Sequence, residues 1–296
     1  MGADIAAIFL AGGWHAHVVE PDAKRWPTLR ERIAKAVSQI GTGAFQPERL
    51  VVAAEIKSVA WDRIEAVIEC VPEKLDLKQA VFAELERHAR ADAILASNSS
   101  SFPITRIAEG LKSAGRMIGL HFFMPAHLVP AVEVIRGEKT DAAAWERAAT
   151  LMRGLDKVPV MVKKDIPGFL ANRIQHALMR EAFALIDAGM ASAEDIDNAV
   201  RYGFGFRYVA AGPILQKDLA GLDIHCSAAT TMYPHLANNA EPSPTLRKLV
   251  ADGKLGVKTG EGFYAWTPER ASAERQRYEK ALAAALAIFA SERKPG

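Results

Sequence analysis

The chain has 296 residues, of which 50% are hydrophobic and 24% are charged, and its net charge is +2. Such totals are typical of a soluble globular protein large enough for two domains or one large one. Without a basic, aromatic-rich segment they argue against a nucleic-acid partner. No apolar run approaches the roughly 18 residues that cross a bilayer, and the N-terminus lacks the basic start and cleavage site of a signal peptide, so we expect no membrane association.

The chain opens with a helix and a short strand. Apolar residues at helical spacing predict a helix over 2–12, which ends at a pair of glycines. Residues 16–19 form a short apolar strand that is closed by Glu20. An acid at the end of the second strand of a βαβ unit binds the ribose hydroxyls of NAD and repels the 2′-phosphate of NADP. Glu20 therefore favours NAD as the cofactor.

The expected start of a dinucleotide-binding fold is missing ahead of this helix. Such a fold begins with a strand and a Gly-x-Gly-x-x-Gly loop, which receives the pyrophosphate at the N-terminus of the following helix. Gly2 precedes Glu20 by 18 positions, a spacing suited to the third glycine of the loop. We favour the interpretation that translation begins upstream of Met1 and adds the strand and two glycines. The alternative is a protein that functions without the loop.

Short apolar strands and helices alternate in the first half of the chain. Strands are predicted over 67–71, 94–97 and 117–120, and helices over 22–40 and 74–90. This alternation indicates an α/β fold of the Rossmann type, with a doubly wound, mostly parallel sheet whose first strand is truncated. Glu73, Ser100 and His121 each follow a strand. We expect them to converge at the carboxyl ends of the strands, where such sheets bind ligands.

The stretch 119–136 contains a candidate pair for proton transfer. His121 ends one apolar run and Glu133 lies in a second, with Pro125 and Pro130 between them. Two short strands meeting at a loop would bring the imidazole and the carboxylate together. A carboxylate that holds one ring nitrogen leaves the other free to accept a proton. The alternative is that His121 is a hydrogen-bonded residue of the core.

The second half of the chain is predicted to be all-helical. The last strand covers 158–162, and amphipathic helices follow around 170–185, 193–202, from 213, and over 269–292. We therefore expect a nucleotide-binding domain over 1–164 and a helical domain over 165–296. A helical domain in this position either closes the cleft or forms a dimer interface.

The two cysteines, Cys70 and Cys226, are far apart and have no metal-type spacing. We expect both to be reduced thiols of the core, with no bound metal and a cytoplasmic location for the protein.

Six segments in order carry a resemblance to a known family. They are VPEKLDLK at 71–78, SNSSSFPIT at 97–105, GLHFFMP at 119–125, VEVI at 132–135, KKDIPGFLANR at 163–173 and KLGVKTGEGFY at 254–264. In this order and spacing the chain resembles the 3-hydroxyacyl-CoA dehydrogenase family, which includes 3-hydroxybutyryl-CoA dehydrogenases. The resemblance extends from Gly2 to about Tyr264 and implies NAD-dependent interconversion of an L-3-hydroxyacyl-CoA and a 3-ketoacyl-CoA by a homodimer.

The resemblance implies a role for each matching position. His121 matches the catalytic histidine and Glu133 its carboxylate partner. Ser100 matches the serine near the reacting oxygen, and Asn172 the asparagine that approaches the site from the helical domain. The positions that match cofactor-binding residues are Gly2, Glu20, Glu73, Lys78 and Asn98.

Several of these residues have a structural alternative. Glu73 could simply begin a helix, where acids are favoured, and residues 97–101 could cap one. Lys78 could be a solvated surface charge, and Asn172 a buried amide between helices. His127 is expected to belong to a loop or to have a structural role.

Two features leave the substrate open. Met124 stands where the family usually has asparagine, and a thioether cannot donate the hydrogen bond of that amide. The sequence of residues 128–134 is closer to that of relatives that oxidise carnitine, gulonate or ring-bearing hydroxymethyl acids. The basic residues of 24–35 (Lys24, Arg25, Arg30, Arg32 and Lys35) could receive a CoA phosphate or form a solvated helix face. A dehydrogenase of a small hydroxy acid without CoA, or a catalytically silent protein, are the alternatives.

Overall fold

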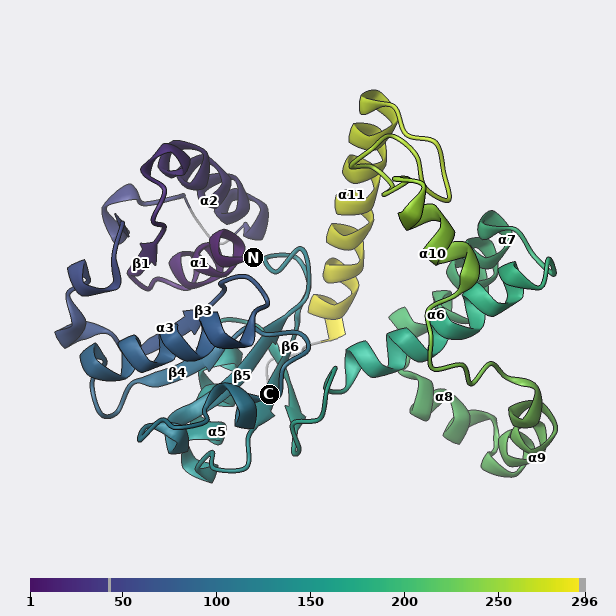
Figure 1. Ribbon diagram of the computed structural model, residues 1–296, viewed down its shortest axis with the longest axis horizontal. Helices are drawn as coiled ribbons and strands as arrows, with labels where there is room; N and C mark the ends of the chain where they lie inside the picture. The colour runs from purple at the N-terminus through teal and green to yellow at the C-terminus, as the bar shows by residue number, and fades with distance from the viewer. Residues whose placement is uncertain (42–43, 293–296) are drawn as a thin grey trace. The chain divides into compact units, whose positions relative to one another are not determined.

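The computed structural model describes residues 1–41 and 44–292 and divides the chain into two compact units, Met1–Asn172 and Arg173–Gly296 (Figure 1). Residues 165–172, expected to belong to the helical domain, form part of the first unit. Phe169 is buried in its core, and the Asp165 carboxylate accepts a hydrogen bond from the backbone N–H of Thr105 at 2.6 Å.

The first unit begins with two helices packed on a pair of strands. Helix α1 (Gly2–Ala11) and helix α2 (Trp26–Ile40) cover β1 (Ala16–Val19) and β2 (Leu50–Ala53), which pair in parallel. The strand predicted over 16–19 is confirmed to the residue. Strand β2 was not predicted, because its four apolar residues lie between short turns and carry no clear period.

The main sheet of this unit has five strands in the order β3-β4-β5-β6-β7. Strands β3 (Ala66–Glu69), β4 (Ile94–Ser97) and β5 (Met117–Phe122) are parallel, β6 (Ala131–Arg136) runs antiparallel to β5, and β7 (Val158–Val162) is parallel to β6. Strand β3 ends two residues earlier than predicted, ahead of the proline at 72. The Rossmann-type class with a mostly parallel sheet is confirmed.

Helices cover both faces of the main sheet. Helices α1 and α5 (Ala142–Gly154) pack on one face, and α3 (Leu75–His88) and α4 (Ile104–Ile107) on the other. Because side chains alternate along a strand, Ile118, Leu120 and Phe122 point to the α5 face. His121 therefore points to the opposite face, toward the core that contains Phe169.

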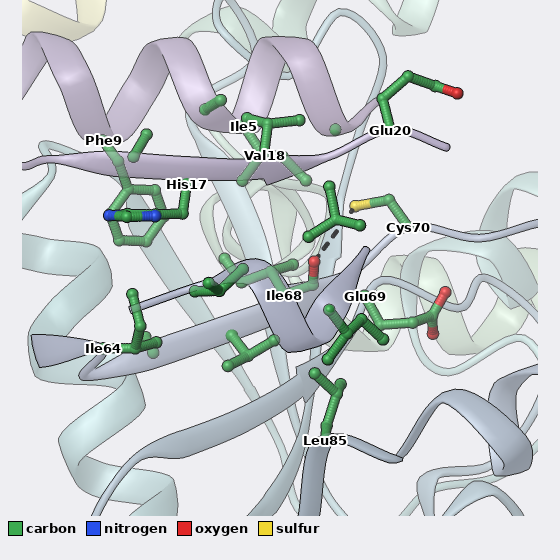
Figure 2. Close-up of a pocket in the computed structure, with 18 of the residues that line it drawn as sticks. Ile5, Phe9, His17, Val18, Glu20, Ile64, Ile68, Glu69, Cys70 and Leu85 are labelled. Atoms are coloured by element: carbon green, nitrogen blue, oxygen red, sulfur yellow. Dashed lines mark hydrogen bonds between the residues drawn. The ribbon is translucent and has the colours of Figure 1, made fainter. Parts of the chain in front are cut away.

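The expected single sheet is divided into two parts. Strand β1 pairs with β2 and strand β3 with β4, and among the described residues no strand pairs with the edges of β1 and β3 that remain. A groove of about 1940 Å³ lies between them, lined by residues that include Ile5, Val18 and Ile68 (Figure 2).

The prediction that both cysteines are core residues was wrong, since both are exposed. Cys70 follows β3 at the groove, where no strand covers it (Figure 2). Cys226 lies on α9 (Leu222–Met232), a helix without buried residues.

The second unit is helical, as predicted. It contains most of α6 (Ala171–Asp187), together with α7 (Ala193–Asn198), α8 (Pro213–Ala220), α9, α10 (Pro244–Ala251) and α11 (Pro268–Glu292). Ser192 and Asp195 form a capping box at the start of α7. Many large apolar side chains of this unit are exposed, including Ile214 and Leu219, each at 77%. Among the helices that the structure describes, none is long and apolar enough to span a membrane.

Candidate active site

His121 and Glu133 face each other across the antiparallel pair β5 and β6. They are direct partners in the strand register, so both side chains lie on the same face of the sheet. His121 Nδ1 lies 2.7 Å from Glu133 Oε2, and the two residues are 5% and 1% exposed. The rings of Phe123 and Phe169 flank the imidazole, with centroids at 4.8 Å and 5.9 Å. The histidine is thus both held by an acid and enclosed by apolar rings.

The second oxygen of Glu133 is held by the start of helix α6. Glu133 Oε1 accepts hydrogen bonds from the backbone N–H groups of Leu170 and Ala171, at 2.9 Å and 2.8 Å. N–H groups at the start of a helix have no partner within the helix, so a carboxylate is well placed there. Burial raises the pKa of Glu133, but the bonds from His121, Ala171 and Leu170 outweigh burial and lower the pKa overall. An ionised Glu133 accepts a hydrogen bond from Nδ1–H of neutral His121, which leaves Nε2 as the ring nitrogen that can accept a proton.

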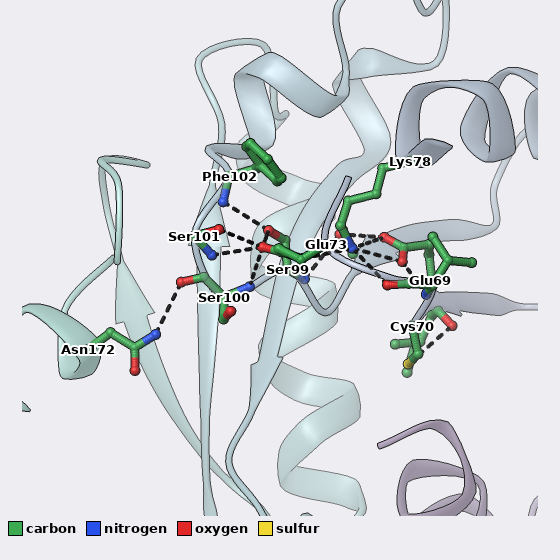
Figure 3. A network of polar contacts seen from close by, with 12 residues as sticks. Glu69, Cys70, Glu73, Lys78, Ser99, Ser100, Ser101, Phe102 and Asn172 are labelled. Carbon is green, nitrogen blue, oxygen red and sulfur yellow. Dashed lines mark hydrogen bonds and ion pairs between the residues drawn. The ribbon is translucent and has the colours of Figure 1, made fainter. Parts of the chain in front are cut away.

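Ser100, Asn98 and Asn172 are joined to this region by hydrogen bonds. The Asn172 side chain donates to the Ser100 carbonyl at 3.1 Å (Figure 3). The Asn98 side chain accepts from the backbone N–H of Phe122 at 2.9 Å, directly after His121. These bonds hold the segment that follows β4 beside the end of β5 and the start of α6.

Glu73 organises the same segment from the other side. Its Oε1 accepts hydrogen bonds from the Ser99 hydroxyl at 2.6 Å, from the backbone N–H groups of Ser100 and Ser101 at 3.1 Å and 3.0 Å, and from the Ser101 hydroxyl at 2.8 Å (Figure 3). Burial raises the pKa of Glu73, but these hydrogen bonds and the charge of Lys78 outweigh it and lower the pKa to about 2. Glu73 is therefore ionised near neutral pH.

Lys78 is buried, so its interpretation as a solvated surface charge is wrong. Its side chain is 1% exposed, and its Nζ lies 2.9 Å from Glu69 Oε1 and 3.2 Å from Glu73 Oε2. Glu69 ends strand β3 and was not among the predicted site residues. The sequence pattern that could have identified Glu69 is an acid at the end of an apolar strand, the same pattern that identified Glu20.

Glu20 and Gly2 lie at the carboxyl end of β1 and the start of α1. The Glu20 carboxylate accepts a hydrogen bond from the backbone N–H of Asp22 at 3.0 Å, and the Glu20 backbone N–H donates to Ala53 at 2.9 Å. No side chain caps α1, whose first turn begins at Gly2. Backbone N–H groups at a helix start and an acid beyond the next strand suit the phosphate and ribose of a dinucleotide. These residues fit NAD.

A second polar cluster ties α1, α2 and the loop after β5 together. Arg32 donates to both oxygens of the buried Asp4, at 2.9 Å and 3.1 Å. His127 Nε2 lies 2.8 Å from Gln39 Oε1, which agrees with the structural role expected of His127. Because Asp4 holds its guanidinium, Arg32 is a poor candidate for a CoA phosphate.

A Rossmann-type unit with a buried His–Glu pair, joined to a helical unit, is the architecture of an NAD-dependent dehydrogenase. Residues 1–166 match the NAD-binding domain of 3-hydroxyacyl-CoA dehydrogenase, and residues 168–266 match its C-terminal domain. The chain therefore belongs to the 3-hydroxyacyl-CoA dehydrogenase family, and the resemblance in the six segments is confirmed. Its cofactor is NAD.

Relatives with different substrates match this chain. It is 36% identical to the 5-formyl-3-hydroxy-2-methylpyridine 4-carboxylate 5-dehydrogenase of Mesorhizobium japonicum over 225 residues, which cover 76% of this chain and 73% of that protein. It is 34% identical to the 3-hydroxybutyryl-CoA dehydrogenase of Mycobacterium tuberculosis over 280 residues, 90% of this chain and 95% of that protein. A solved structure of the pyridine-carboxylate dehydrogenase, an NAD⁺-dependent dismutase, matches with a TM-score of 0.92 and 30% identity, covering 100% of this chain and 96% of that chain.

Proposed function

We propose that His121 is the general base of an NAD-dependent alcohol oxidation and that Glu133 is its partner. The 2.7 Å contact between His121 Nδ1 and Glu133 Oε2 supports this proposal most strongly. The two N–H groups of Leu170 and Ala171 keep the carboxylate in place, so the ring is oriented before substrate arrives. The imidazole is buried, and Nε2 is the nitrogen left to meet the substrate.

In the forward direction, the hydroxyl proton of the substrate passes to His121 Nε2. Bound NAD would supply the hydride acceptor for this oxidation. Glu133 stabilises the imidazolium that forms, because its negative charge lies in hydrogen-bond contact with the ring. We assign Ser100 and Asn172 to hydrogen bonding at the reacting oxygen. In reverse, protonated His121 supplies the proton to the carbonyl.

The proposed cofactor contacts follow the positions of the residues. Glu20 would hold the ribose hydroxyls, and the N–H groups that start at Gly2 would receive the pyrophosphate. Glu73, Lys78 and Asn98 would line the nicotinamide side.

The proposed substrate is an L-3-hydroxyacyl-CoA, the substrate class of the family. A second candidate is a ring-bearing hydroxy or formyl acid without CoA, like the substrate named for the Mesorhizobium relative. Met124 favours this second candidate. Its side chain is 67% exposed three residues after His121, where the family usually has an amide, and a thioether packs well against an aromatic ring. The engagement of Arg32 by Asp4 points the same way.

Turnover measurements separate these candidates. We expect NADH formation with either L-3-hydroxybutyryl-CoA or a hydroxymethyl pyridine carboxylate, and the substrate with the higher kcat/KM identifies the class. Binding of NAD without turnover of any hydroxy compound would instead identify a catalytically silent member of the family.

We further propose a cytoplasmic homodimer that uses residues 165–296 for dimerisation and closure of the cleft. Exposed apolar side chains of the second unit support the dimer, since patches of this kind mark protein interfaces. Light scattering during gel filtration should give twice the chain mass, and Leu219→Glu should shift the protein toward the monomer. Cell fractionation tests the location.

A further inference from the structure

Glu69 is a buried carboxylate that the proposed reaction does not use. Its Oε1 accepts hydrogen bonds from the backbone N–H of Val71 at 2.6 Å and from Lys78 Nζ at 2.9 Å. Its Oε2 accepts from the Ser97 hydroxyl at 2.7 Å. The same oxygen accepts from Lys78 Nζ at 3.1 Å (Figure 3). A buried acid is retained without a large penalty only when it is paired and hydrogen-bonded in this way.

A continuous chain of polar contacts leads from Glu69 to the proposed site. Lys78 binds Glu69 on one side and Glu73 Oε2 on the other, at 3.2 Å. Glu73 Oε1 in turn binds the N–H of Ser100, whose carbonyl accepts the hydrogen bond from Asn172. The contacts of Glu69 are to Val71, Lys78 and Ser97, so Lys78 links it to Glu73 and to the segment that carries Ser100.

The network carries one surplus negative charge. Two carboxylates, Glu69 and Glu73, surround a single ammonium, Lys78. The hydrogen bonds from Ser99 and Ser101 keep Glu73 ionised. A charge in a partly buried cluster is screened less than one in water, so it acts on charged ligands nearby.

We infer that Glu69 is a positioning residue that makes the nicotinamide site favour the oxidised cofactor. The nicotinamide ring of NAD⁺ carries a positive charge that it loses on reduction to NADH. A surplus negative charge beside the ring stabilises NAD⁺ relative to NADH. This inference rests on the proposed placement of the nicotinamide next to Glu73 and Lys78.

The experiment compares the Kd values of NAD⁺ and NADH, measured by calorimetry and by NADH fluorescence on the full chain. Glu69→Gln keeps an acceptor for Lys78 but removes the surplus charge. The preference for NAD⁺ over NADH should fall about fivefold. In the double variant Glu69→Gln with Lys78→Met, one carboxylate remains without an ammonium. The surplus charge is restored, so the preference for NAD⁺ should rise above that of Glu69→Gln alone. Glu109→Gln, an exposed acid paired with Arg106 at 3.8 Å, is the control and should change nothing.

An unchanged preference in Glu69→Gln would overturn the inference. A double variant whose preference falls as far as that of Glu69→Gln would also overturn it, because a purely structural role of Glu69 predicts no difference between these two variants. If Glu69→Gln does not fold, Glu73→Gln removes the same charge from a half-buried position, and an unchanged preference there is equally decisive. Failure of the wild-type protein to bind either cofactor form also overturns it. The measurement needs no turnover. A catalytically silent protein would therefore contradict the proposed function while the cofactor preference still tested this inference.

Discussion

Replacing Glu133 by glutamine should change the tautomer of His121. The amide has one acceptor oxygen where the carboxylate has two. The backbone N–H groups of Leu170 and Ala171 both point at that position, so the amide oxygen is expected to face them. The amide NH₂ then faces Nδ1 of His121 and can only donate. Nδ1 must become the acceptor and Nε2 must carry the proton, so the ring can no longer accept the substrate proton.

The opposite orientation of the amide is unfavourable. It would turn the NH₂ group toward two partly buried N–H groups, and a fully buried donor left without an acceptor costs about 1–3 kcal/mol. We therefore expect kcat to fall by about 10²–10⁴, the range for loss of general acid–base catalysis. That range corresponds to about 2.7–5.5 kcal/mol in the activation free energy.

The assay is the initial rate of NADH formation at saturating substrate, with circular dichroism to verify that the variant is folded. Glu138→Gln, which changes an exposed acid just beyond β6, is the control and should retain wild-type kcat. A folded Glu133→Gln variant with kcat within about threefold of wild type would refute the assigned tautomer.

Three further predictions concern the cofactor, the packing and the acid stability. Extending the chain ahead of Gly2 by a strand of about five apolar residues and a Gly-x-Gly turn should fill the groove between β1 and β3 and tighten NAD binding about tenfold; equal Kd values in calorimetry would contradict this. Gly119→Ala places a Cβ 2.8 Å from Ile135 Cβ and 3.0 Å from Ile104 Cδ1, so urea denaturation should show a free energy of unfolding lower by about 1–3 kcal/mol. Gly154→Ala, where no heavy atom lies within 4 Å of the added Cβ, serves as the control. Folding lowers the pKa of Glu73 from 4.5 to about 2, so its stabilisation is present above pH 4.5 and is lost as the pH falls toward 2. The Tm of Glu73→Gln should therefore depend less on pH in this window, and parallel Tm curves would count against the assignment.

Much of the fold could be predicted from local pattern. The strands at 16–19, 94–97 and 158–162 are short apolar runs between turn signals, and the structure has them at these residues. Strand β2 is just as short but lies among 3₁₀ turns, so neither period nor flanking residues distinguished it. Burial of Cys70 depended on cover for the edge of β3, and burial of Cys226 on packing against α9; no local pattern describes either.

In the candidate site, too, some contacts could be predicted from local pattern and others could not. His121 and Glu133 could be paired in advance, because two runs broken by prolines form neighbouring strands. Their partners could not, since the N–H groups of Leu170 and Ala171 reach Glu133 only through the turn at 167–169. The burial of Lys78 likewise depends on Glu69, nine residues away on a different element. Such long-range pairings are set by packing and leave no local pattern in the sequence.

The most direct test of the central claim is the turnover of His121→Ala. With the substrate identified in the turnover comparison, kcat should fall by about 10²–10⁴ while the Kd of NAD stays at the wild-type value, because the imidazole is assigned to proton transfer and not to the cofactor. Near-normal kcat in a folded His121→Ala protein would contradict the assignment of His121 as the general base.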